Sequence, residues 1–327
     1  MKQRAGRGGW KRARAALSLS CVLAACARDA NVQAPAAATP EPKPVIGQSA
    51  AQPTPQELTL VRALPIQNLN NFQPSGLIWF EGQLLTISDK HDDAIFALEL
   101  TGEEAIPHVF REIIAPPEEP KPFDLEGITV GEDGELLLAS EERSRVLAVP
   151  RSGRAYWLGE SLLRAGQRVG LFRQENAGLE GITRLPNGDL LLCAEREPRG
   201  FLRLSGGAPY AWQQDTSIYA LPAGRPPDCA DLTSVGDKVY ELERGSHMIV
   251  RLDPTQQSCT ELEAYSYART ENDPRFAYEN SRFARAEGLA VDHDHIYVLL
   301  DNNGDARLGA PEDRRPLLFI FARPHEG

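Results

Sequence analysis

The sequence has little of what usually identifies an enzyme. Its 327 residues include two methionines, four tryptophans and six histidines, and only GESLLRAG (159–166) has a clear helical periodicity. It contains no G-x-S-x-G turn, no phosphate-binding P-loop and no H-E-x-x-H zinc motif. The chain therefore offers no familiar protein nucleophile, and an all-helical or doubly wound fold is not supported.

Positive charge is also scarce relative to negative charge. The formal net charge is −11, and residues 1–25 hold six Lys/Arg and no acid, so the chain without them carries −17. Such a surface repels nucleic acid and attracts cations. A nucleic-acid partner is therefore excluded.

No apolar run is long enough to span a bilayer. After the basic segment MKQRAGRGGWKRAR, the stretch AALSLSCVLAA has eleven residues, the length of a signal-peptide core. It ends in Leu23-Ala24-Ala25-Cys26, which resembles the lipobox of bacterial lipoproteins. We predict a lipoprotein signal peptide at 1–25 and lipidation of Cys26; a plain secretory signal is the alternative. The residue after Cys26 is Ala27, which favours anchoring in the outer membrane, facing the periplasm.

Large apolar side chains are almost absent from residues 26–56, which are rich in Ala and Pro. Such a segment cannot bury a core, so we expect a disordered tether there and a folded domain at 57–327. Three cysteines fall in the domain: Cys193, Cys229 and Cys259. An oxidising envelope permits one disulfide, and we favour Cys229–Cys259, because Cys193 lies inside an apolar run.

What the sequence does have is a repeat. The pentapeptide LEGIT occurs at 125–129 and again at 179–183, and alignment on it recovers five units. They begin at Ser75, Glu126, Glu180, Ala230 and Glu287, so that successive starts differ by 51, 54, 50 and 57 residues. A fixed period near 50 residues indicates a repeat architecture.

Each unit contains short apolar runs joined by tight turns such as EDG, PNG and VGD, which are hairpin signals. A fourth run follows the third at 106–110, 154–158, 217–221 and 260–267. Four-stranded antiparallel units at this spacing predict an all-β fold, a β-propeller.

The fifth unit ends after its third strand, whereas the apolar stretch LTLVRALPI (58–66) has no unit of its own. Because an open propeller would leave unpaired backbone groups, we expect this N-terminal strand to close the ring as the outer strand of the last blade. This predicts five four-stranded blades. A ring of six blades is the alternative, if residues 160–178 or 266–286 contain a degenerate blade.

The acids follow the repeat. In a blade the first strand is innermost and the second runs back, so the start of strand one and the end of strand two share one mouth of the central channel. Strand one begins with Ser75, Glu126, Glu180, Ala230 (followed by Asp231) and Glu287. Strand two ends with Asp89, Glu141, Glu195, Glu243 and Asp301. The sequence therefore predicts an acidic ring at one end of the axis.

Clustered carboxylates repel one another unless bases, protons or a metal compensate them. A base often follows the strand-two acids (Lys90, Arg143, Arg196 and Arg244), which is consistent with structural salt bridges. The strand-one glutamates have no base next to them in sequence. We therefore predict a calcium site, since calcium accepts many oxygen ligands in flexible geometry. Its ligands are expected to be Glu126, Glu180 and Glu287, with Ser75, Asp231 and Asp301.

Four segments resemble one bacterial family, the phytase-like ("esterase-like activity of phytase") proteins. They are SDK (88–90), GLEGITRLPNGDLLLCAERE (178–197), DLTSVGDKVYELERG (231–245) and AEGLAVDHDHIYVLLDNN (286–303). The resemblance implies a propeller exported to the envelope, with phosphoesterase activity. Its motif positions here are Glu180, Glu243, Arg244, Glu287 and Asp301. Ala230 departs from the Glu-Gly pattern, which argues against a symmetrical ring of five carboxylates.

The sequence favours two functions, and a lactonase-like or other hydrolase is a third alternative. One is a calcium-dependent phosphoesterase that uses metal-activated water, with Glu195 or Glu243 as base and Arg196 or Arg244 holding phosphate. The other is a non-catalytic propeller with structural calcium, which binds a small, phosphorylated molecule or an envelope protein.

Overall fold

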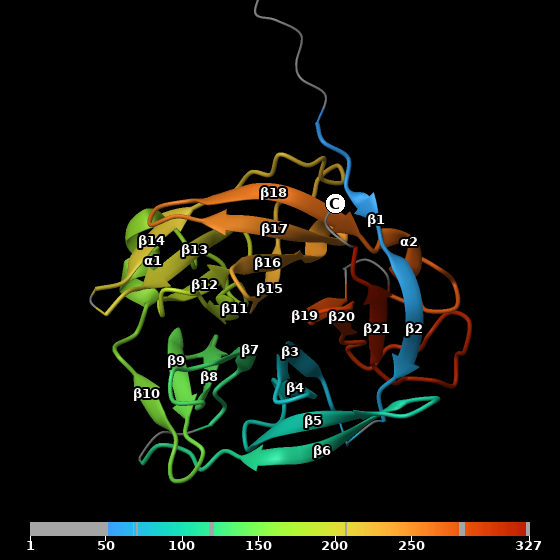
Figure 1. The fold of residues 1–327 in the computed structure, drawn as a ribbon, viewed down its shortest axis with the longest axis horizontal. Coiled ribbons are helices and arrows are strands. Elements are labelled where there is room, and N and C mark those ends of the chain that lie inside the picture. Colours follow the sequence, from blue (N-terminus) through green and yellow to red (C-terminus); the bar gives the residue numbers. More distant parts are fainter. Residues whose placement is uncertain are drawn as a thin grey trace, which may run out of the picture. The chain divides into compact units, whose positions relative to one another are not determined.

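The chain folds into a ring of five β-sheets around a central axis (Figure 1). The structure, a computed structural model, describes residues 52–324 except 68, 70, 118–120, 207 and 281–284. It is all-β, with 48% strand and 5% helix. The prediction of a five-bladed propeller is confirmed. The predicted signal peptide, Cys26 and most of the expected tether lie outside the described residues.

Each blade is an antiparallel sheet whose first strand lies at the axis. Blade one is β3 (Pro74–Phe80), β4 (Gln83–Ser88), β5 (Ala94–Leu100) and β6 (Ala105–Glu112); blade two is β7 (Leu125–Val130), β8 (Leu136–Ser140), β9 (Arg145–Val149) and β10 (Tyr156–Leu158). Blade three is β11 (Leu179–Arg184), β12 (Leu190–Ala194), β13 (Gly200–Leu204) and β14 (Tyr210–Gln213); blade four is β15 (Cys229–Val235), β16 (Lys238–Glu243), β17 (Met248–Pro254) and β18 (Cys259–Ser266).

Blade five is closed by the N-terminal strand. It consists of β19 (Ala286–Val291), β20 (His295–Leu300) and β21 (Leu317–Ala322), and β2 (Thr59–Pro65) pairs antiparallel with β21 as its outer strand. This is the predicted closure. The short β1 (Gln56–Glu57) pairs parallel with β18, so the same segment also holds the edge of blade four.

One predicted strand is wrong. The fourth strand of blade three is β14, and not the segment at 217–221. In the structure the Ser217 hydroxyl and the Ile218 amide both donate to the Glu261 carboxylate of blade four. The segment therefore crosses to the next blade, because a buried carboxylate there takes up its polar groups.

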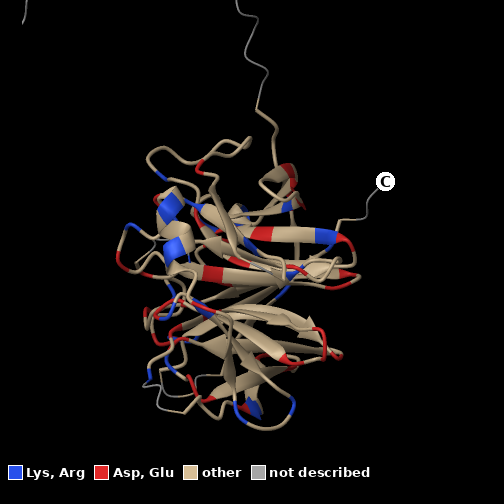
Figure 2. Cartoon of the chain, turned by 90° about the vertical axis from the view of Figure 1, so that its left-hand side faces the viewer, with Lys and Arg blue, Asp and Glu red and all other residues tan. Residues whose placement is uncertain are grey.

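The helices are small. They are α1 (Leu163–Val169), α2 (Ala268–Glu271) and the 3-10 turn η1 (Arg244–Ser246). Within the described part of the chain, no helix is long and apolar enough to cross a membrane. The side view in Figure 2 shows most Asp, Glu, Lys and Arg in turns and at strand ends, with the strands largely uncharged.

The hydrophobic core is divided among the blade interfaces. Five clusters of buried side chains each join two neighbouring blades; one, for example, joins Leu85 and Ile87 of blade one to Leu125 and Ile128 of blade two. Both faces of a blade are therefore buried. This explains why strands such as LLLAS and LLLCA are continuous apolar runs with no alternation.

The Glu-Gly motif marks the closest packing in the ring. A Cβ at Gly127 would lie 2.3 Å from the Glu180 carbonyl oxygen of the next blade, and one at Gly181 would lie 2.4 Å from the Leu232 nitrogen. Every first strand also has a register shift at the motif. Glycine is thus required because backbones of adjacent blades touch there.

Blade four has Asp231 where the other blades have this glycine, and its side chain reaches across the axis. The carboxylate accepts hydrogen bonds from the amides of Leu77 in blade one (3.1 Å), Leu289 in blade five (2.8 Å) and its neighbour Leu232 (2.8 Å). It is fully buried. Its oxygens hold the inner strands together, so the predicted role of Asp231 as a metal ligand is not supported.

Removal of β2 should destabilise the whole ring. Leu64 and Ile66 are buried, and each contributes about 1.5–3 kcal/mol by burial, while β21 would be left as an open edge. We expect a chain of residues 68–327 to lose cooperative thermal unfolding and a chain of residues 56–327 to keep it, as measured by circular dichroism. Equal melting temperatures for the two chains would refute this account of closure.

Asp231→Ala should be strongly destabilising. The substitution leaves three buried amides without an acceptor, at a cost of about 1–3 kcal/mol each. Urea unfolding with a chelator present measures the loss, with the exposed turn variant Asp237→Ala as control. Asp231→Asn, which keeps one carbonyl oxygen, should lose less. If Asp231→Ala were as stable as the control, the side chain would not be needed at the axis.

Candidate functional site

Most of the predicted acids converge at one mouth of the channel, whereas Asp231 and Glu243 have other partners. Each lies where a first strand begins or a second strand ends, and the electrostatic effects cross blade boundaries. Beyond the effect of burial, the charges of Asp124, Asp89 and Glu287 raise the pKa of Glu126. The charges of Glu126 and Glu287 likewise raise the pKa of Glu180. We call this end of the channel the acidic mouth; it comprises Asp89, Asp124, Glu126, Glu141, Glu180, Glu195, Asp228, Glu287 and Asp301.

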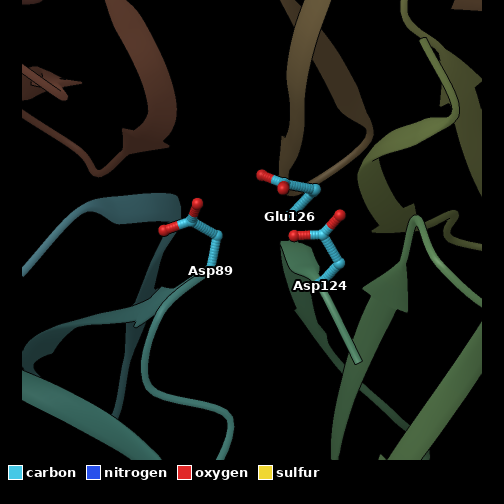
Figure 3. A group of neighbouring side chains, drawn as sticks. All are labelled: Asp89, Asp124 and Glu126. Carbon is cyan, nitrogen blue, oxygen red and sulfur yellow. The ribbon is translucent and has the colours of Figure 1, made fainter. Parts of the chain in front are cut away.

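A first carboxylate group lies between blades one and two. Oxygens of Asp89, Asp124 and Glu126 lie within 4.8 Å of one another (Figure 3). Ser75, expected to be a metal ligand, instead donates its hydroxyl to Glu126 at 2.5 Å, and Lys90 pairs with Asp89. Part of the charge in this group is therefore already compensated.

A second carboxylate group lies between blades two and three. It consists of Glu141, Glu180 and Glu195, again with oxygens within 4.8 Å. The Gly178 amide donates to Glu141 Oε1 at 2.8 Å. Glu195 is 3% exposed, and its Oε2 has no hydrogen-bond partner among the described residues. An oxygen-only donor set with an unsatisfied buried oxygen fits a hard cation.

Burial and repulsion by neighbouring acids make three of these carboxylates, Glu126, Glu141 and Glu180, hard to ionise. Burial raises the pKa of Glu126 and of Glu180 well above the ordinary value, and for Glu180 the neighbouring Glu126 raises it further. Burial likewise raises the pKa of Glu141 to about 7. A proton or a bound cation would relieve the repulsion within the second carboxylate group, in which Glu195 already pairs with Arg196 and Arg244.

Arg244 provides much of the compensation on the other side of the mouth. Its guanidinium pairs with Glu287 at 2.5 Å, with Asp228 at 3.0 Å and with Glu195. The expectation that the strand-one glutamates lack a neighbouring base is therefore wrong for Glu287. Sequence adjacency missed this contact because Arg244 follows β16 of blade four and reaches blades three and five.

The predicted residues Glu243, Asp301 and Arg196 each have partners of their own. Glu243 accepts hydrogen bonds from the Asp228 amide at 2.9 Å and from Ser246, and it does not line the cavity described below. Asp301 accepts from the Asn303 amide at 3.0 Å, and burial raises its pKa to about 6. Arg196 pairs with Glu195.

A cavity of about 650 Å³ opens beside the second carboxylate group. Three arginines and four acids line it, together with small and amide-bearing residues. The complete lining is Asn176, Glu195, Arg196, Glu197, Gly224, Arg225, Pro226, Asp228, Arg244, Gly245, Glu287 and Asn303. The predicted residues Glu195, Arg196, Arg244 and Glu287 are among them. The cavity thus combines carboxylates with guanidiniums, which suits an anionic ligand bound together with a cation.

Sequence reasoning missed Asp124, Asp228 and Arg225. Asp124 and Asp228 each lie two residues before the first position of their unit, Glu126 and Ala230. The repeat could therefore have pointed to both. Arg225 lies in a connection between blades, where the repeat has no information.

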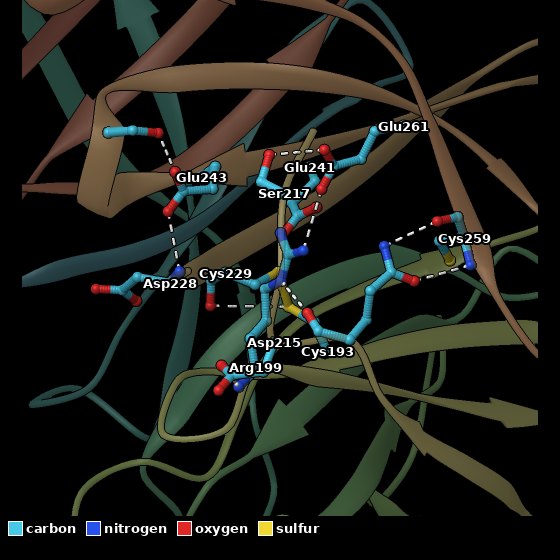
Figure 4. Close-up of polar contacts among 12 residues, drawn as sticks. Cys193, Arg199, Asp215, Ser217, Asp228, Cys229, Glu241, Glu243, Cys259 and Glu261 are labelled. Atoms are coloured by element: carbon cyan, nitrogen blue, oxygen red, sulfur yellow. Dashed lines mark hydrogen bonds and ion pairs between the residues drawn. A yellow bond between two sulfur atoms is a disulfide. The ribbon is translucent and has the colours of Figure 1, made fainter. Parts of the chain in front are cut away.

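A disulfide fixes two cavity segments. It joins Cys193 of β12 to Cys229 of β15, and Cys259 has a free, buried thiol (Figure 4). The predicted Cys229–Cys259 pair is wrong, because both faces of a blade are buried and an apolar run can point a cysteine at the next blade. The Cys229 amide also donates to the Glu195 carbonyl at 3.0 Å, which ties Glu195 to the Asp228 segment.

A family model described as "Phytase-like: Esterase-like activity of phytase" matches residues 73–304, more than half of the chain. No curated protein sequence matches this chain.

Solved structures that are similar in fold have low sequence identity to this chain. Myxococcus xanthus glutaminyl cyclase is 16% identical, with TM-score 0.48, over 83% of this chain and 100% of that one. The PQQ-bound aldose sugar dehydrogenase of Streptomyces coelicolor is 13% identical, with TM-score 0.46, over 84% and 100%. Staphylococcus aureus virginiamycin B lyase is 13% identical, with TM-score 0.41, over 78% and 68%. Likeness at this level says nothing about the reaction of this chain.

Proposed function

The chain belongs to the phytase-like family, and on that premise we propose that its acidic mouth is a calcium-dependent phosphoesterase site. The observation that carries the proposal is the position of Glu195. It belongs both to the second carboxylate group and to the wall of the arginine-lined cavity. A cation held by the second carboxylate group would lie next to an anion held in the cavity.

The proposed ligands are Glu141, Glu180 and Glu195. They differ from the ring expected from the sequence, because these are the three carboxylates whose oxygens lie within 4.8 Å of one another. Asp231 is bound by backbone amides, and Arg244 pairs with Glu287 as well as with Glu195. All three offer carboxylate oxygens, and Glu195 Oε2, which has no hydrogen-bond partner among the described residues, could bind a cation while Oε1 pairs with Arg196 and Arg244. Calcium is favoured over magnesium because three acids on separate strands suit flexible coordination better than a strict octahedron.

When bound, a divalent cation would offset the negative charge, polarise a phosphoryl oxygen and make water more acidic. The residues of the chain supply the rest. Arg196 and Arg225 line the cavity and can donate to phosphate oxygens. Glu287 also lines it, and burial raises its pKa to about 7 although Arg244 lowers it. A carboxyl group with such a pKa can accept a proton from attacking water at neutral pH.

The second candidate is a non-catalytic propeller that binds a small molecule or an envelope protein with structural calcium. Arg244 favours it, since this guanidinium already holds three carboxylates and would fix the mouth rather than act in a reaction. In that case Glu287 would position Arg244 and would not transfer a proton.

Calcium should stabilise the domain through Glu141. A ligand that binds only the native state adds about 2.7 kcal/mol at 100 times its Kd, and Glu141→Gln should abolish most of this gain. The matched control is Glu142→Gln, since Glu142 is adjacent and 52% exposed at its side chain. Thermal melting with calcium and with chelator measures the effect. If neither calcium nor chelator changed the melting temperature of the domain, the proposed cation site would be refuted.

The same variants separate catalysis from binding. Hydrolysis of 4-nitrophenyl phosphate should fall with Glu141→Gln, and Glu287→Gln should lower kcat by about 10²-fold or more while keeping the calcium stabilisation. Calcium binding without any hydrolysis by the native protein would favour the non-catalytic propeller.

For localisation we propose a lipid anchor at Cys26 in the outer membrane, facing the periplasm. The support is the Leu-Ala-Ala-Cys sequence after a basic and apolar leader. Cys26→Ser should move the protein from the membrane fraction to the soluble fraction without altering its melting temperature, with Cys21→Ser as control. Retained lipid label in Cys26→Ser would contradict the anchor.

A further inference from the structure

The channel has a second opening, at the end opposite the acidic mouth. The five inner strands begin at the acidic mouth, so their last residues meet at the other end of the axis (Figure 1). A cavity of about 320 Å³ opens there, and each blade contributes to its wall. Its lining includes Trp79 of β3, Thr129 of β7, Arg184 of β11, Thr233 of β15 and Val291 of β19. We call it the axial cavity.

The axial cavity differs from the acidic mouth in charge. Among the described residues that line it, none is acidic and Arg184 alone is charged. The Arg184 Nη2 lies 3.5 Å from the carboxylate of Glu132, whose side chain is 83% exposed. A Cβ on Gly188 would lie 3.4 Å from the same nitrogen, so the guanidinium stands between the hairpin turns of blades two and three. Its charge is offset by Glu132 at the rim, and the cavity therefore favours an uncharged ligand.

Two threonine hydroxyls of the axial cavity lack a partner. Thr129 and Thr233 hold the fifth position of the repeated LEGIT unit, and they are 4% and 5% exposed. Neither hydroxyl has a hydrogen-bond partner among the described residues. A buried hydroxyl without a partner is costly, and a hydroxyl can both donate and accept. Both threonines therefore favour a ligand that brings hydroxyl groups of its own into the cavity.

Trp79 supplies a flat apolar surface beside these hydroxyls. Its indole stacks on Tyr297 of blade five, with ring centroids 5.6 Å apart and an angle of 12° between the planes. Trp79 is 37% exposed, and because Tyr297 covers one face of the indole, the exposed part is the other face and the ring edges. Ligand cavities have volumes of roughly 300–1,000 Å³, so a cavity at the lower end of this range suits a single ring. A ring with apolar C–H faces and surrounding hydroxyls matches both the indole and the threonines.

We propose that the axial cavity binds one neutral monosaccharide, with the sugar ring on Trp79 and sugar hydroxyls bonded to Thr129 and Thr233. This site is separate from the proposed phosphoesterase site, because it lies at the other end of the channel and needs no cation. Sugar binding there does not depend on the proposed reaction.

Calorimetric titration of the full chain in chelator with D-glucose, D-galactose and N-acetyl-D-glucosamine tests the proposal. At least one of these sugars should bind saturably. Thr129→Val and Thr233→Val should each raise its Kd by about 2- to 10-fold, because each loses one hydrogen bond while valine keeps the β-branched shape. The matched control is Thr183→Val, the same position of LEGIT in blade three. Thr183 is 1% exposed and does not line the cavity, so this variant should bind like the native protein.

Tryptophan fluorescence gives a second measurement. Sugar binding should change the fluorescence of the native protein, because the ligand covers the exposed part of Trp79. Trp79→Phe, which keeps an aromatic ring on Tyr297, should remove this change. The other described tryptophans, Trp157 and Trp212, do not line the axial cavity.

Three results would overturn the proposal. The first is that none of the three sugars binds more tightly than about 10 mM. The second is an equal Kd for Thr129→Val and Thr183→Val, or sugar binding that is lost in Glu141→Gln, which would place the sugar at the acidic mouth. The third is D-glucuronate binding at least about tenfold more tightly than D-glucose and depending on Arg184, which would make the site one for anions. Absence of phosphoester hydrolysis would refute the proposed reaction and leave the sugar site standing.

Discussion

The close packing of five inner strands at the axis is the constraint on which the rest of the structure depends. Glycines at the start of these strands let the backbone of one blade touch the next, and the side chain of Asp231 joins three of the five strands through their amides. Because these contacts fix the strands at their first residues, they also fix the carboxylates that stand there. The geometry of the acidic mouth follows from backbone packing.

This packing brings several carboxylates together in buried surroundings, where they repel one another, and the compensation of their charge differs around the ring. Around blade four, Arg244 neutralises carboxylates from three blades. Between blades two and three, Glu141, Glu180 and Glu195 lie together with one oxygen of Glu195 unsatisfied, and burial raises the pKa values of Glu141 and Glu180. The ring is therefore asymmetric, unlike a perfect repeat, and the structural ion network around Arg244 meets the candidate cation site at Glu195.

Blades three and four carry most of the features that shape the cavity beside the second carboxylate group. The disulfide links Cys193 to Cys229, and the buried Arg199 donates both to blade four and to the segment that crosses between the two blades. The disulfide is close in sequence to both acids of the site, because Cys193 comes two residues before Glu195 and Cys229 follows Asp228. A rigid junction at this place suits a site that must keep a guanidinium, several carboxylates and a ligand in one arrangement.

The sequence by itself determined the architecture. The 50-residue repeat, the hairpin turns and the unpaired LTLVRALPI strand predicted five blades and their closure, because these features depend on local pairing and on a periodicity that can be read along the chain. It also predicted which acids share one mouth, since antiparallel strands return to the same end. Tertiary structure decided how those acids are partnered. Arg244 reaches Glu287 across 43 residues, Asp231 bonds to Leu77 across 154, and Cys193 meets Cys229 because blade faces point at their neighbours. Such contacts arise between blades, where neither period nor adjacency specifies which side chain meets which.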